Sequence, residues 1–178
     1  MSFKDFIKED MAKCEFLANR KTWLRVRFLH EHEYIIWKYQ LLLRKEEYYA
    51  LKGNIILSTY YRIRKNILGQ RLGFTIHKNV FGQGLRIWHY GNVVVNAEAR
   101  VGKNCILHGN NCIGNNGLSN GNPTIGDNVE FGVGSCAIGD IIIGNNVIIG
   151  AGAVVNKSFP EGNCVLAGVP AKIIKKLQ

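Results

Sequence analysis

The stretch from residue 125 to residue 155 reads IGDNVEFGVGSCAIGDIIIGNNVIIGAGAVV, and an apolar residue returns at every sixth position. The same phase extends upstream and is missed only at Ser119. Its ten apolar positions are Val95, Val101, Leu107, Ile113, Ile125, Phe131, Ala137, Ile143, Ile149 and Val155. A six-residue period gives no steady stripe on an α-helix of 3.6 residues per turn. It favours a solenoid of short strands instead.

Three hexads would make one triangular coil, with the apolar residue of each hexad pointing to the axis and successive coils about 4.8 Å apart. The chain must bend sharply where two strands meet, and Gly or Asn tolerates the positive φ that such bends require. We therefore expect most of the glycines and asparagines here to form corners. Residues 115–123 interrupt the period and have the composition of a loop.

The first half of the chain has a different pattern. Apolar residues recur there at spacings of three and four, which predicts amphipathic helices. One helix is expected from about Ser58 to Leu68, with Ser58 as its N-cap and Gly69 as its end. Four cations would form a basic surface near it: Arg62, Arg64, Lys65 and Arg71.

The whole chain has 178 residues and a net charge of +10, from 23 Lys and Arg against 13 Asp and Glu. This charge suits an anionic ligand, nucleic acid or a membrane surface. No apolar run approaches the length of a membrane span, and residues 1–10 alternate in charge, so a cytoplasmic protein is expected. Without a C-x-x-C pair, we expect buried thiols and no structural zinc from the five cysteines, Cys14, Cys105, Cys112, Cys136 and Cys164.

The hexapeptide pattern resembles that of the left-handed parallel β-helix acyltransferases, from about residue 74 to residue 172. The resemblance implies a mainly β fold, a left-handed parallel β-helix of hexapeptide repeats preceded by an α-helical region. We expect the helical region at residues 1–72, the β-helix at 73–160 and a C-terminal capping tail at 161–178. It also implies a homotrimer.

Residues 84–95, GLRIWHYGNVVV, are similar to the segment of serine O-acetyltransferases and their sugar-modifying relatives that carries the catalytic histidine. Carried over, His89 is the general base, and His108 is the alternative. His30 and His32 lie in the helical half and are expected at the surface. The resemblance places the acceptor near four residues: Trp88, His108, Asn110 and Asn122.

Residues 154–160 and 166–172 are similar to the ending of coenzyme A-dependent members, which implies acetyl-CoA as co-substrate and no metal. Lys157 and Lys172 would pair with the cofactor phosphates. By position, the pantetheine arm would lie against small residues: Gly114, Val133, Gly134, Ala151 and Gly152.

Two departures bear on the acceptor. Serine acetyltransferases have an acidic partner for the histidine about fifteen residues upstream, where this chain has only residues 73–76, GFTI. They also have an Arg-His pair that meets the amino-acid carboxylate, and the matching residues are Gly121 and Asn122. A neutral acceptor therefore fits better, and direct O-acetylation of a sugar hydroxyl in surface polysaccharide or glycoconjugate biosynthesis is predicted.

Three alternatives remain open. The first is serine O-acetylation for cysteine biosynthesis, and the second is acetylation of a small xenobiotic. The third is a non-catalytic assembly or nucleic-acid-binding module that uses the basic helical half, although acids interleaved with the cations there argue against nucleic acid. Peripheral membrane contact would also suit this charge.

Overall fold

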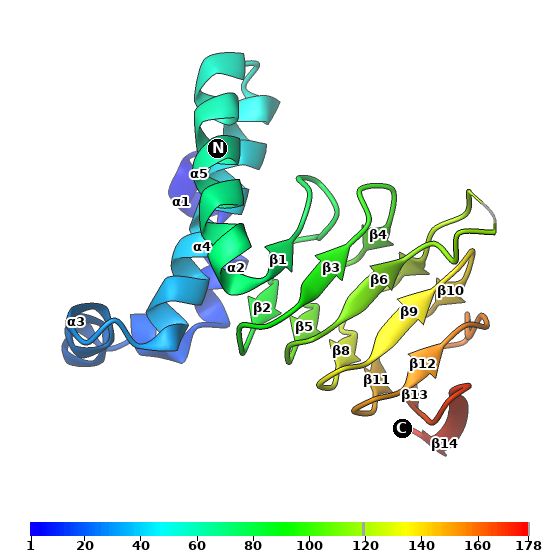
Figure 1. The fold of residues 1–178 in the computed structure, drawn as a ribbon. Helices are drawn as coiled ribbons and strands as arrows, with labels where there is room; N and C mark the ends of the chain where they lie inside the picture. Colours follow the sequence, from blue (N-terminus) through cyan, green and yellow to red (C-terminus); the bar gives the residue numbers. More distant parts are fainter. Residues whose placement is uncertain (119, 178) are drawn as a thin grey trace.

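The computed structural model describes residues 1–118 and 120–177, and its second half is a three-sided coil of short parallel strands (Figure 1). We call the three sides sheets A, B and C. Sheet A contains β1 (Phe74–Thr75), β3 (Val93–Val95), β6 (Cys112–Gly114), β9 (Cys136–Ile138) and β12 (Val154–Val155). Sheet B contains β4 (Arg100–Val101), β7 (Thr124–Ile125) and β10 (Ile142–Ile143). Sheet C contains β2 (Arg86–Ile87), β5 (Ile106–Leu107), β8 (Glu130–Phe131), β11 (Val147–Ile149), β13 (Cys164–Ala167) and β14 (Lys172–Lys176).

The register confirms the six-residue period. Val94 pairs with Cys112 eighteen residues further on, which is one coil of three hexads. All ten apolar positions of the period are buried in one continuous core. Burial of these side chains along the axis is the main stabilising contribution to a coil whose strands are only two to five residues long.

A column of asparagines holds one row of corners in register. Asn104, Asn128, Asn146 and Asn163 all have positive φ values between 46° and 57°. Each side-chain amide donates to the next: Asn104 to Asn128, Asn128 to Asn146 and Asn146 to Asn163, at 2.9–3.0 Å. Asparagine suits these corners because it tolerates the left-handed conformation and its amide links one coil to the next.

The first half of the chain is helical and covers the start of the coil (Figure 1). A long antiparallel pair, α4 (His32–Leu51) and α5 (Ile55–Leu72), leads into β1. Before it come four short elements: α1 (Phe3–Phe6), α2 (Lys8–Ala12), the 3₁₀ helix η1 (Glu15–Leu17) and α3 (Arg20–Phe28). α3 lies at the end of the molecule away from the strands.

A buried charged network joins the helices to the first coil. The Arg44 guanidinium donates to the carboxylates of Asp10 and Glu47 and to the carbonyls of Phe81 and Gly82. Asp10, Arg44 and Glu47 are all at least 96% buried. Burial lowers the pKa of Arg44, but the neighbouring Glu47 and Asp10 carboxylates outweigh it and hold that pKa above its usual value. Lys65 is similarly buried, pairing with Glu46 at 2.8 Å and donating to the Ile76 carbonyl.

The third expected helix has different limits. α5 begins at Ile55 because the side chain of Asn54 caps it, accepting from the Leu57 N–H at 3.0 Å. Ser58 lies inside the helix and donates to the Glu46 carbonyl of α4. Gly69 is also inside the helix. A side chain there would clash, because a Cβ would lie 2.6 Å from the Phe74 carbonyl oxygen. The helix ends at Gly73, whose φ is +77°.

Two further expectations differ from the structure. Lys65 is buried, so it is not part of an exposed basic surface. The parallel coil continues past the boundary at residue 160, because β13 pairs in parallel with β11, from Val147 with Cys164 to Ile149 with Leu166. Among the strands of the described ranges, only β14 runs antiparallel, and it closes sheet C.

Candidate active site

The chain crosses the corner between sheet C and sheet A once in every coil, and His89 lies in the first of these turns, between β2 and β3. We call this corner the His89 edge. The imidazole is exposed, and His89 Cβ would lie 3.4 Å from a Cβ placed on Gly109, the facing residue of the next coil. Gly109 has a φ of +120°, so glycine is required there. The turn therefore presents His89 outward on a rigid corner.

The ring that packs against His89 comes from the helical half. His32, in the first turn of α4, stacks on it with ring centroids 5.6 Å apart and an interplanar angle of 25°. Tyr90 meets the same His32 edge-on at 6.5 Å. Among the described residues, neither ring nitrogen of His89 has a hydrogen-bond partner. Both nitrogens therefore remain available to a substrate.

A second histidine stands on the adjoining outer face of sheet C. His108 Nε2 lies 2.8 Å from Glu130 Oε1, and its ring stacks on Trp88 with centroids 6.2 Å apart. The guanidinium carbon of Arg86 lies over the Trp88 ring, 4.7 Å from its centroid. A histidine that is paired with a carboxylate has a fixed orientation and tautomer. His108 is thus the more firmly held of the two histidines.

Small residues continue down the His89 edge. Gly134 N–H donates to the Gly109 carbonyl and Gly152 N–H to the Val133 carbonyl, so these turns stack directly below one another. Gly134 and Gly152 both have positive φ values, of +71° and +67°. Val133, Ala151 and Gly152 are exposed. The result is a narrow strip, bare of large side chains, that leads from His89 along four coils.

Three other expected site residues lie on a different corner. Gly114, Asn122 and Lys157 belong to the turns from sheet A to sheet B, and Gly114 is buried at the end of β6. The Asn122 amide donates to the Asn120 carbonyl, while its Oδ1 is buried with no hydrogen-bond partner in the described structure. We call this corner the Asn122 edge. One copy of the chain therefore does not bring these residues to His89.

The last two expected residues have separate places. Asn110 is on the His89 edge, but its Oδ1 accepts from the Asn92 N–H and its φ is +55°, so it works as a corner. Lys172 begins the exposed strand β14. Within the described ranges, no three His, Cys, Asp or Glu side chains are placed to hold a metal ion.

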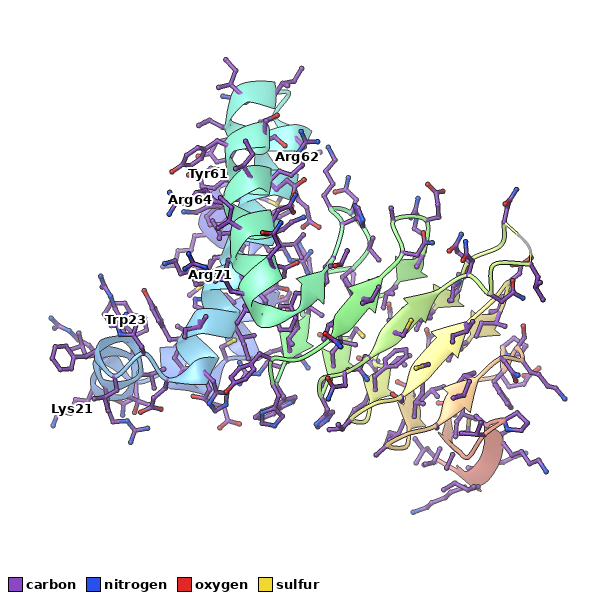
Figure 2. All side chains as sticks on the ribbon, in the orientation of Figure 1. Lys21, Trp23, Tyr61, Arg62, Arg64 and Arg71 are labelled. Atoms are coloured by element: carbon purple, nitrogen blue, oxygen red, sulfur yellow. The ribbon has the colours of Figure 1, made fainter. Side chains whose placement is uncertain are left out.

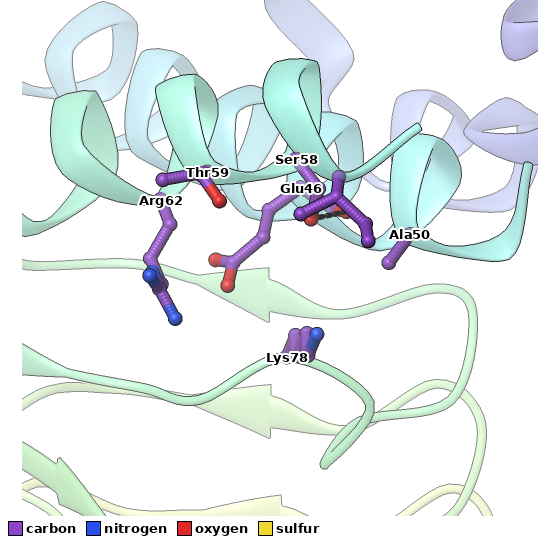
Figure 3. A pocket seen from close by; sticks show the side chains of 7 residues that line it. Glu46, Ala50, Ser58, Thr59, Arg62 and Lys78 are labelled. Atoms are coloured by element: carbon purple, nitrogen blue, oxygen red, sulfur yellow. Dashed lines mark hydrogen bonds between the residues drawn. The ribbon is translucent and has the colours of Figure 1, made fainter. Parts of the chain in front are cut away.

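The largest cavity of the described structure is not at the His89 edge. A cavity of about 670 Å³ lies between α5 and the first coil, and a neighbouring one of about 320 Å³ shares Glu46, Arg62 and Lys78 with it. Figure 3 shows these three side chains directed into the space between the helix and the coil. None of the residues expected at the site lines either cavity. The candidate site is therefore an open strip along an edge, which is typical of a surface shared with another copy.

Two site residues were not anticipated from the sequence. Glu130 stands just before Phe131 in the hexad pattern, and its register against Ile106 would have placed it on the outer face beside His108. His32 was expected at the surface and is exposed, yet it contacts His89. Nothing in the local sequence signals that contact, because it depends on how α4 packs against the coil.

Comparison with known proteins agrees with this fold. Residues 122–157 match the family described as bacterial transferase hexapeptide (six repeats). No curated protein sequence matches the chain. Serine acetyltransferase from Brucella abortus, solved with coenzyme A, is 29% identical over 83% of this chain and 57% of that one, with a TM-score of 0.64. The Neisseria gonorrhoeae serine acetyltransferase is 25% identical over 98% of this chain and 68% of that one, with a TM-score of 0.71.

Soybean serine acetyltransferase, at 22% identity, shares the fold over 97% of this chain and 69% of its own length, with a TM-score of 0.71. The chain spans slightly more than half the length of the Brucella abortus enzyme. The repeat, the family match and these likenesses agree with the parallel coil described above. Residues 122–157 thus match a hexapeptide transferase family, and the chain as a whole is similar in fold to serine acetyltransferases, which are left-handed β-helix acyltransferases.

Proposed function

We propose that this protein transfers an acetyl group from acetyl-CoA to a hydroxyl group, with His89 as the general base. The observation that carries the proposal is the position of His89 at the head of the strip of small residues on its edge. The complex of the Brucella abortus relative with coenzyme A supports the choice of co-substrate. The acetyl-pantetheine arm would lie along Val133, Gly134, Ala151 and Gly152, with its thioester next to His89.

Direct acetyl transfer needs one general base and room for the two substrates. A ring nitrogen of His89 takes the proton of the acceptor hydroxyl while that oxygen attacks the thioester carbonyl carbon. The tetrahedral intermediate then breaks its C–S bond, and the departing thiolate of coenzyme A receives the proton. A bare edge admits both substrates, and the rigid coil holds the imidazole without a moving lid.

A trimer would complete the site. Sheet A lies between the His89 edge and the Asn122 edge, and its outer face carries the column Val94, Cys112, Cys136 and Val154. This apolar column suits contact between copies. Such contact would bring the His89 edge of one copy to the Asn122 edge of the next, together with Gly114 and Lys157.

The trimer is tested with Val94→Asp, which places a charge on that column. Ile142→Asp on sheet B is the matched control, because Ile142 is similarly exposed, at 53% against 47% for Val94. Analytical ultracentrifugation should show a trimer for the wild type and the control, and smaller species for Val94→Asp. A monomeric wild type would overturn this part of the proposal.

Two acceptors have support. The similar structures described above are serine acetyltransferases, so L-serine is the acceptor that these comparisons favour. Gly121 and Asn122 favour a neutral hydroxyl such as that of a sugar. They replace an Arg-His pair, and its absence would cost a bound carboxylate roughly 1.5–3 kcal/mol of charge-assisted hydrogen bonding.

Release of free thiol from acetyl-CoA decides between them. The wild-type protein is assayed with L-serine and with a panel of sugars and nucleotide sugars at equal concentration. Turnover with serine at least tenfold above every sugar supports the serine acceptor, and the reverse ratio supports the sugar. Hydrolysis unaffected by any hydroxyl acceptor would contradict O-acetyl transfer itself.

A further inference from the structure

The outward face of α3 has an apolar ridge with cations on both sides. Leu24 and Phe28 are four residues apart, so they lie one above the other on the same face. They are 48% and 85% exposed, and the adjacent Leu29 is 60% exposed. At about 100° per residue, Arg20 and Arg27 lie on one side of this ridge and Lys21 and Arg25 on the other.

The opposite face of α3 fixes the helix to the body of the protein. Val26 is fully buried in a small core with Cys14, Phe16 and Trp37, and Trp23 packs against that core. Figure 2 shows Lys21 and Trp23 on this helix, at the end of the molecule away from the strands. The helix is therefore held in place while Leu24 and Phe28 face outward.

The charged side chains of α3 itself all have one sign. The nine residues of α3 include four cations and no acid. Arg25 pairs with Glu31 at 3.3 Å, but its side chain is 63% exposed, so the pairing is weak. Arg27 lies 5.1 Å from the Trp23 ring and extends over its face. The surface thus combines a strong positive potential with an apolar ridge.

We propose that α3 docks on an anionic phospholipid surface, with Leu24 and Phe28 entering the headgroup boundary. The flanking cations would then contact lipid phosphates. This is the arrangement of a helix that lies in the plane of a membrane, with apolar side chains on one face and cations beside them. Among the residues described, no helix is long and apolar enough to cross a membrane, so the contact is peripheral.

Other occupants explain the surface less well. A nucleic acid would attract the cations and could stack on the Phe28 ring, but it would leave the aliphatic side chain of Leu24 in water. A second copy meeting α3 through the same face would bring two sets of four cations together, and like charges repel. An anionic membrane would pair with the cations and would also take the apolar ridge out of water. The inference does not depend on the acetyl transfer proposed above.

Sedimentation with lipid vesicles tests the proposal. The full chain is mixed with vesicles of phosphatidylcholine alone, or of phosphatidylcholine with phosphatidylglycerol, in low and high salt. We expect binding to the anionic vesicles at least tenfold tighter than to the neutral ones, and weaker binding as salt screens the cations. Equal binding to both vesicle types, or none to either, would overturn the proposal.

Variants separate the two contributions. Phe28→Ser should weaken vesicle binding roughly tenfold, because the ring no longer enters the boundary. Lys21→Ser should weaken it roughly fivefold, from the loss of one cation near the surface. The matched controls on α5, Ile56→Ser at a residue 83% exposed and Arg64→Ser, should leave binding unchanged. All four positions are exposed, so the thermal melts should match.

Two results would assign α3 to another partner. If Phe28→Ser changes nothing while double-stranded DNA competes the protein off the vesicles, the surface binds polyanions in general and the lipid assignment is wrong. If the protein self-associates without vesicles and Phe28→Ser abolishes that association, the ridge is a contact between copies.

Discussion

Replacing Arg44 by methionine should destabilise the protein more than any single exposed substitution. Arg44 is the one cation between the buried carboxylates of Asp10 and Glu47, and it also donates to two carbonyls of the first coil. Methionine preserves most of the volume but removes the charge and every donor. Two carboxylates then remain buried beside each other with no cation within this network.

The expected cost follows from that geometry. Removing one partner from a buried, hydrogen-bonded ion pair costs about 3–5 kcal/mol, because the remaining charge is left uncompensated. For a domain of this size, each kcal/mol lowers Tm by roughly 2–4 °C. We therefore expect Arg44→Met to lower Tm by about 10 °C, and the helical half to lose its fixed attachment to the coil.

Differential scanning calorimetry at one protomer concentration measures the effect. Arg25→Met is the matched control, since it removes the exposed Arg25–Glu31 pair, in which the side chains are 63% and 31% exposed. That pair should contribute less than about 1 kcal/mol. If Arg44→Met melts within about 2 °C of the control, the network does not join the two halves as argued.

Three further predictions concern the coil and its neighbouring core. Asn128→Ala should lower the free energy of unfolding in urea by about 2 kcal/mol, because it loses two amide hydrogen bonds between successive coils and strains a corner at φ +56°. Asn128→Gly should cost less, because glycine adopts that φ without strain. Equal losses for the two variants would refute the corner strain. Gly132→Ala should cost about 1–3 kcal/mol, since its Cβ would lie 2.7 Å from a backbone nitrogen, while Gly114→Ala, whose Cβ has 3.5 Å of clearance, should melt like the wild type. Burial raises the pKa of Cys14 from 9.0 to about 11 even though Arg86 donates to its sulfur, so the thiol stabilises the fold fully below about pH 9 and that stability is lost as the pH rises toward 11. Between pH 8 and pH 11 the wild type should lose about 2 kcal/mol more than Cys14→Ala does, and parallel pH profiles would contradict this assignment.

The coil could be predicted from the sequence because the six-residue period is marked by apolar residues, which the coil buries along its axis. From Val95 to Val155, ten of the eleven positions in the six-residue phase are apolar, and those ten are buried. The same reasoning missed the last coil. The position six residues after Val155 is Glu161, which breaks the phase, yet β13 pairs with β11 and buries Leu166 against the core. A shortened corner shifts the phase, and periodicity alone does not reveal such a shift.

The site was partly predictable. His89, Val133, Gly134, Ala151 and Gly152 were expected from a resemblance, and the structure places them along one edge. The contact with His32 was not predictable, because it depends on the packing of α4 against the coil. The predicted start of α5 at Ser58 was wrong for a local reason. Ser58 is a good N-cap in isolation, but its hydroxyl donates to a carbonyl of α4, and Asn54 caps the helix instead.

The central claim is that His89, and not the better-held His108, takes the proton from the acceptor. Its most direct test is thiol release from acetyl-CoA by His89→Ala and His108→Ala beside the wild type, with the preferred acceptor at saturation and all melting temperatures matched. We predict a loss in kcat of about 10²–10⁴-fold for His89→Ala and a far smaller one for His108→Ala. If His89→Ala turns over normally and His108→Ala does not, the base is the His108–Glu130 pair and the assignment is wrong.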